Sequence, residues 1–244
     1  MGIVITFFLG IFILLGTAIA KSAKNEKLIE QLSISIAFGT MTTLSLTELI
    51  PEAVENMGGS NLLLTLFPIF AGVIILKILD KFIPDHDNAH GFDHDCTPEN
   101  VIHIGIISSI AVILHNIIEG MAVYGMTSSS LTTAFMLSLG VGLHNIPMGM
   151  VIYSTLKNEK KNIKLFLLAA VSLSTMAGGI IMNFMWAMIN DFVIGVLISL
   201  TLGMIIYLII FELLPHIMHS KNKKLSMLGI LIGIAVIIAG EFIG

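Results

Sequence analysis

The sequence has no arginine, a single cysteine and a single tryptophan, and only 11% of its 244 residues are charged. A soluble domain carries about 25% charged residues, so a soluble globular fold is excluded. The one cysteine, Cys96, excludes a disulfide within the chain. The sequence is instead rich in hydrophobic residues, which make up 56% of the total, and its mean hydropathy is +0.98. These values indicate an integral membrane protein.

Apolar stretches long enough to cross a bilayer recur along the whole chain. A membrane-spanning helix needs about 20 predominantly apolar residues. We expect eight such spans, at about residues 2–20, 32–50, 60–79, 100–124, 130–155, 164–188, 192–215 and 225–243. The loops between them are short and polar. The sequence therefore predicts an all-α membrane protein in which residues 1–244 form one transmembrane domain.

The positions of the lysines predict the orientation. All 12 lysines lie in or beside the loops after the first, third, fifth and seventh spans, at 21–27, 77–81, 157–164 and 221–224. Positively charged loops face the cytoplasm. We therefore expect these four loops inside and both chain termini outside the cell. Lysine without arginine suggests an AT-rich bacterial genome, and hence a bacterial plasma (inner) membrane.

The second and seventh spans carry a repeated pattern. In each, a glycine precedes Glu-Leu-x-Pro by nine residues, Gly39 before Glu48 and Gly203 before Glu212. Because the lysines place the two spans in opposite directions, the pattern predicts an inverted repeat of spans one to three in spans six to eight, with spans four and five inserted between them. The alternative is two unrelated helix ends that share a short motif.

Inverted repeats are a common construction of secondary transporters, which hold substrate near the membrane midplane and open to each side in turn. On that interpretation Glu48 belongs to the outer mouth of a pathway. Glu212 and His216 belong to the inner mouth.

The longest loop, at about residues 82–99, is rich in histidine and aspartate. It contains His86, His90 and His94, and such tracts offer nitrogen and oxygen ligands to divalent metals. It is predicted to face the cytoplasm as a loose metal-capturing segment. A plain solvated loop is the alternative.

The fourth and fifth spans carry two similar polar runs, His-Asn-Ile-Ile-Glu-Gly at 115–120 and His-Asn-Ile-Pro-Met-Gly at 144–149. Ionisable residues inside a bilayer usually mark a site or a pathway. His115 and Glu119 are four residues apart, so they share one helix face. His115 and His144 are equally distant from the turn at residues 129–130, which places them at the same depth, about 20 Å from the turn.

Two imidazoles and a carboxylate at one level form a ligand set that Zn²⁺ and Fe²⁺ accept. Pro147 adds to this interpretation, because a proline inside a helix frees the backbone carbonyl of Leu143, and a neighbour, water or an ion must satisfy it. A purely structural polar cluster is the alternative. It does not explain why two separate helices each place a histidine at matched depth.

These features together resemble the ZIP (Zrt/Irt-like) family of divalent-metal transporters over nearly the whole chain. The resemblance implies metal uptake into the cytoplasm without ATP, an elevator-like movement of one helix group against another, and a homodimer. It implies that His115, Glu119 and His144 are metal ligands, that Asn116 and Asn145 flank them, and that the thioether of Met41 lies near the same metal.

The chain departs from the family pattern at two positions. Met148 stands where the family commonly has a glutamate, which makes its thioether, like that of Met41, a candidate weak ligand. Met176 stands where a second carboxylate is expected on the sixth span. Both changes fall on the second ion of the two-metal arrangement seen in part of the family. We therefore predict one metal rather than two. Thioethers are softer than carboxylates, so Zn²⁺, Fe²⁺ or Cd²⁺ is favoured over Mg²⁺ and Ca²⁺.

The competing functions are a membrane metalloenzyme and a metal sensor that uses the same site without transport. An enzyme needs a positioned water and a general base, a role that Glu119 is able to take, but the chain has no His-Glu-x-x-His run. We therefore predict a transporter and not an enzyme. Its partners are the metal ion, the lipid bilayer and a second copy of the chain, with no nucleic acid.

Overall fold

The computed structural model describes residues 1–58, 62–82, 98–129, 131–185, 190–220 and 222–243, and these residues contain helices and no strand. The long helices are α1 (Gly2–Ser22), α2 (Glu26–Leu44), α4 (Leu62–Phe82), α5 (Pro98–Ser129), α6 (Leu131–Thr155), α7 (Lys161–Met185), α8 (Asp191–Tyr207) and α10 (Lys223–Ile243). Two π-helical segments, η1 (Ser45–Leu49) and η3 (Leu208–Leu213), join α2 to α3 (Ile50–Asn56) and α8 to α9 (Leu214–His219).

The prediction of an all-α membrane protein is confirmed. Among the described residues, seven helices are long and apolar enough to cross a bilayer, and α6, with 25 residues, is a further long helix. The helices extend beyond several of the predicted spans. The second, for example, begins at Glu26 rather than near residue 32.

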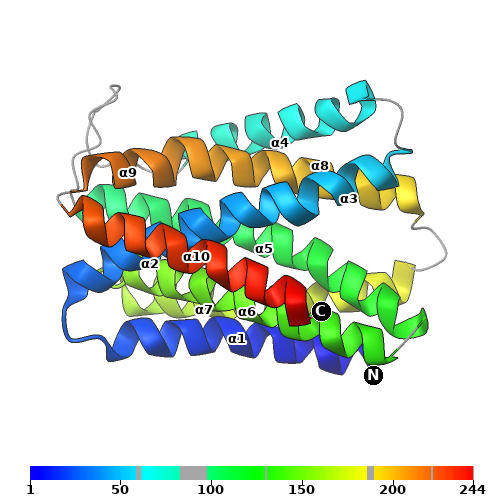
Figure 1. Cartoon of the computed structure of the whole chain (residues 1–244), viewed down its shortest axis with the longest axis horizontal. Helices are drawn as coiled ribbons and strands as arrows, with labels where there is room; N and C mark the ends of the chain where they lie inside the picture. The colour runs from blue at the N-terminus through cyan, green and yellow to red at the C-terminus, as the bar shows by residue number, and fades with distance from the viewer. Residues whose placement is uncertain (59–61, 83–97, 130, 186–189, 221, 244) are drawn as a thin grey trace.

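The helices form two groups. The first, which we call the four-helix bundle, consists of α1, α5, α6 and α7, which pack on one another. The second, the flanking layer, consists of α2, α4, α8 and α10 with their short continuations, and pairs α2 with α10 and α4 with α8. Figure 1 shows α4 and α8 in the upper part of the view, α1, α6 and α7 in the lower part, and α2, α5 and α10 between them.

The lysine-bearing helix ends meet at one end of the molecule. They are the C-terminal ends of α1 and α4 and the N-terminal ends of α2, α7 and α10, on the left in Figure 1. We call this the lysine-rich end and the opposite side the cavity end.

The packing of helix pairs follows the predicted inverted repeat. In the repeat α1, α2 and α4 correspond to α7, α8 and α10. Accordingly α1 packs on α6 as α7 packs on α5, and α2 packs on α10 as α8 packs on α4. Each of the two inserted helices, α5 and α6, thus packs on the first helix of one half of the repeat.

The glycines of the repeated pattern explain the second pair of contacts. Gly39 lies against Gly233 of α10, and Gly203 lies against Gly72 of α4. A Cβ atom on any of these residues would meet backbone of the partner helix. Small residues let membrane helices approach closely and gain van der Waals contact, which drives their association in lipid. The glycine that precedes each Glu-Leu-x-Pro is therefore a packing residue.

The helices do not end at the Glu-Leu-x-Pro runs, where the predicted second and seventh spans end. The chain remains helical through Pro51 to Asn56 and through Pro215 to His219. The reason is the π-helical turn before each proline, in which the residue before the proline donates its N–H five residues back, Ile50 to Ser45 and Leu214 to Ile209. This wider turn accommodates a proline that has no N–H of its own.

Candidate metal site

The predicted ligands of the fourth and fifth spans come together where α5 and α6 face each other. One ligand atom from each of His115, Glu119 and His144 lies within 4.8 Å of the others. Glu119 Oε1 is 2.7 Å from His144 Nε2 and 3.7 Å from His115 Nε2. The two imidazole centroids are 6.0 Å apart, so the rings lie at one level, as their equal spacing from the turn predicts.

These side chains are almost completely buried, with exposed fractions of 6% for His115, 9% for Glu119 and 3% for His144. Several polar atoms around them have no hydrogen-bond partner among the described residues, namely His115 Nε2, Glu119 Oε2 and Asn116 Oδ1. Buried polar atoms in proteins normally have a partner. Unpartnered ligand atoms converging on one point fit a site that a metal ion or water completes.

A cavity of about 420 Å³ connects this group to the cavity end of the molecule. His115, Glu119 and His144 line it, together with Glu48 of η1 and two further carboxylates of α3, Glu52 and Glu55. The remaining lining is mostly apolar. A cation entering from this side therefore meets three carboxylates before it reaches the buried histidines.

The other residues predicted near the metal lie in different surroundings. Met41 and Met148 are 0% and 1% exposed, belong to the hydrophobic core, and are not among the residues that line the cavity. Asn116 donates from Nδ2 to the carbonyl oxygen of Val171 at 3.4 Å, which ties α5 to α7. A ligand role for either methionine stays a prediction.

A second polar group lies at the lysine-rich end. Asp80, His103 and Glu212 each place one ligand atom within 4.8 Å of the others. His103 Nε2 is 2.5 Å from Asp80 Oδ1, and the Tyr207 hydroxyl donates to Asp80 Oδ2 at 2.9 Å. His103 precedes His115 by 12 residues, so this group lies about 18 Å further along α5.

Sequence reasoning identified Glu212 and His216 at this end and missed two of their neighbours. Glu212 and His216 are each 8% exposed. Asp80 stands between Lys77 and Lys81, where it resembled an ordinary loop charge, and His103 lies just inside the fourth span. The signal that was available is His103 itself, an ionisable residue in an apolar segment. His86, His90 and His94 lie outside the described residues.

Comparison with known proteins gives a consistent result. Residues 83–240 match the family model described as ZIP Zinc transporter. The chain is 28% identical to the zinc transporter ZupT of Clostridium perfringens, over 97% of this chain and 93% of the relative. It is 28% identical to that of Streptococcus mutans and 29% identical to that of Lysinibacillus sphaericus, in each case over 95% or more of this chain and 93% of the relative.

Proposed function

The chain belongs to the ZIP zinc transporter family, and from that premise we propose that it moves Zn²⁺ across the membrane into the cytoplasm, using His115, Glu119 and His144 as the transport site. Fe²⁺ is the second candidate cargo. The observation that carries the proposal is the buried group of two imidazoles and one carboxylate at the inner reach of a cavity with acidic walls. Nitrogen and carboxylate ligands of this kind suit Zn²⁺.

The proposed pathway has three stages. Glu48, Glu52 and Glu55 attract the cation at the cavity end, because clefts lined by one sign of charge raise the local concentration of counter-ions. The buried ligands then take it up. Glu212 and His216 receive it at the lysine-rich end after the four-helix bundle has moved against the flanking layer, so that the two ends open alternately.

Three further properties are part of the proposal. The positive-inside rule places the lysine-rich end in the cytoplasm and both termini outside a bacterial plasma membrane. The ZIP resemblance supports a homodimer. Residues 82–99, with His86, His90 and His94, serve as a cytoplasmic metal-capturing loop.

The direct test is metal flux into proteoliposomes that contain only this protein and an entrapped zinc-sensitive dye. Uptake driven by a zinc gradient alone is the expected result. A sensor or a membrane metalloenzyme that uses the same ligands binds zinc but gives no flux, so zinc binding without flux would overturn the proposal. Competition by Fe²⁺, Cd²⁺ and Mg²⁺ in the same assay ranks the cargo.

Uptake is expected to decrease as the pH falls from 8 to 5. A metal binds neutral imidazole, and an ordinary histidine takes up a proton at about pH 6.5, so protons compete with the ion at His115 and His144. The measurement is the initial rate of zinc uptake with equal pH on both sides of the membrane. A rate that does not change over this range would argue against the two histidines as direct ligands.

The site is expected to hold one metal ion. Among the described residues, the group of three ligands formed by His115, Glu119 and His144 contains one carboxylate, and Met148 and Met176 occupy the positions at which a second ion would need more. The measurement is anomalous diffraction from crystals soaked in Cd²⁺. Two strong peaks a few ångströms apart at this site would contradict the prediction.

A further inference from the structure

Several long-range polar contacts among the described residues stay within one helix group. Inside the four-helix bundle, Thr17 of α1 donates to the carbonyl of Gly149 of α6, and Asn116 of α5 donates to α7. Inside the flanking layer, Gln31 of α2 donates to Ser226 of α10, and Tyr207 of α8 donates to Asp80 of α4. Such contacts hold each group together and do not resist movement of one group against the other.

Two polar pairs among the described residues cross between the groups. His103 of α5, in the four-helix bundle, pairs with Asp80 of α4, in the flanking layer, at 2.5 Å. Lys157, which follows α6, pairs with Glu30 of α2 at 3.9 Å between Nζ and Oε2. Both pairs lie at the lysine-rich end. At the opposite end the same boundary is hollowed, because the cavity is lined by α5 and α6 on one side and by η1, α3, α8 and α10 on the other.

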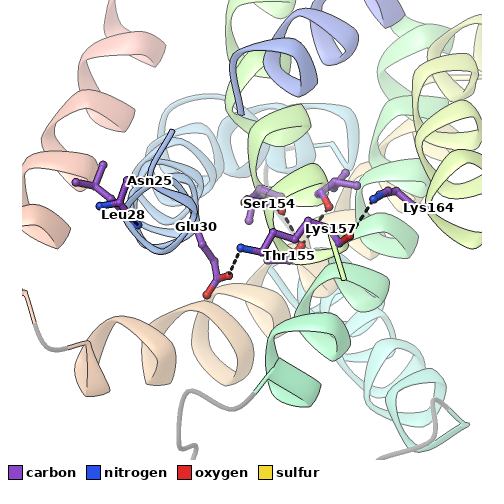
Figure 2. A network of polar contacts seen from close by, with 9 residues as sticks. Asn25, Leu28, Glu30, Ser154, Thr155, Lys157 and Lys164 are labelled. Carbon is purple, nitrogen blue, oxygen red and sulfur yellow. Dashed lines mark hydrogen bonds and ion pairs between the residues drawn. The ribbon is translucent and has the colours of Figure 1, made fainter. Parts of the chain in front are cut away.

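One partner of each crossing pair is anchored within its own helix group, Asp80 through its side chain and Lys157 through its backbone. Tyr207 fixes the Asp80 carboxylate within the flanking layer. Lys164 of α7 donates from Nζ to the carbonyl oxygen of Lys157 at 2.9 Å (Figure 2). The Lys164 ammonium also lies 5.6 Å from the ring centroid of Tyr153, so two contacts hold the end of α6. Figure 2 shows Lys157 reaching from this fixed turn toward Glu30. If the groups separate at this end, these anchors remain and the crossing pairs break.

We propose that the pairs His103–Asp80 and Lys157–Glu30 form a latch that holds the lysine-rich end closed while the cavity is open, and that both pairs break in every transport cycle. The inference rests on the proposed alternating access. The four side chains are 15–23% exposed, so water reaches them. Partial exposure makes the latch reversible, because each polar group can be hydrated when its pair opens, whereas breaking a fully buried pair leaves a polar group without a partner at high cost.

The test is the rate at which a membrane-impermeant maleimide labels a cysteine in the cavity, measured in nanodiscs without metal. Cys96 is the only cysteine in the sequence, so Cys96→Ser provides a clean background. Ala122→Cys then reports the cavity, which Ala122 lines. Lys157→Met and, separately, His103→Gln are expected to slow this labelling about two- to fivefold, because loss of one weak pair shifts the population toward the state with the cavity closed.

Two controls complete the test. The charge swap Glu30→Lys with Lys157→Glu restores the pair in reverse and is expected to return labelling to the parent rate. Lys224→Met removes an exposed lysine from the same end and is expected to change nothing. Unchanged labelling in both single variants, or no recovery in the swap, overturns the latch. Faster labelling also overturns it, because that outcome reports general loosening. Since the assay contains no zinc, failure of the proposed transport in proteoliposomes is a separate result.

Discussion

Replacing Glu119 with glutamine is expected to reduce zinc uptake by about 100-fold or more, because even outer-shell partners of a metal site cost 10- to 100-fold when removed. Glu119 is the only carboxylate in the group with His115 and His144, and its Oε1 lies nearest to both imidazoles. Without it the ion would meet two neutral ligands in a buried place and no compensating negative charge. The measurement is the initial rate of zinc uptake in proteoliposomes.

This loss is expected without loss of the fold. Glutamine has the shape of glutamate, and its amide can still hydrogen-bond a neutral imidazole of His144, so the melting temperature of the purified variant should change little. Glu159→Gln is the matched control, because it removes one carboxylate from the loop after α6 at the opposite end of the molecule. If Glu119→Gln takes up zinc at a rate within twofold of the parent, Glu119 is not a ligand of the transported ion.

Gly16→Val is expected to lower the melting temperature of the purified protein by about 5–10 °C, given that overpacking costs about 1–3 kcal/mol and a backbone clash costs more. Gly16 is where α1 meets α6, and a Cβ there would collide with the carbonyl of Ile146 and the backbone of Met150. Ile146 is two residues beyond His144, so α6 can yield only by moving a ligand. Zinc uptake is therefore expected to fall with the melting temperature.

Ala18→Val is the control for this substitution. Ala18 lies on the same helix and is exposed, so the same branched side chain should reach the lipid without meeting α6. Thermal unfolding in detergent, followed by loss of a monodisperse peak, measures both variants. Equal melting temperatures for Gly16→Val and Ala18→Val would show that the close approach of α1 and α6 is unimportant for stability.

Much of the architecture could be predicted because it depends on patterns along the chain. The helices follow from apolar stretches of sufficient length. The repeat follows from Gly39 and Gly203, each nine residues before a glutamate, and each of these glycines packs against the backbone of a partner helix, α10 and α4 respectively. The matched depth of His115 and His144 follows from their equal number of residues to the turn between α5 and α6. In two antiparallel helices, equal numbers of residues from the turn give equal distances along the helix axes.

The features that escaped prediction depend on contacts between helices or on hydrogen-bond register. Asp80 and His103 are 23 residues apart, with the longest loop between them, and nothing in that spacing says that their side chains meet. The π-helical turns escaped for another reason. A proline after Glu-Leu-x is normally evidence that a helix ends. Here the helix continues because the backbone hydrogen bond before each proline reaches five residues back instead of four.

Those π-helical turns also change the direction in which the side chains after them point around the helix axis. A π turn holds one more residue than an α turn, and one residue corresponds to a rotation of about 100° around the axis. Everything beyond η1, including Glu52 and Glu55, is therefore rotated relative to the face that begins at Gly39. A deletion of one residue inside η1 would return the helix to a regular register and turn both carboxylates away from the cavity. The number of residues in this short stretch, rather than their identity, decides which face of the helix meets the incoming ion.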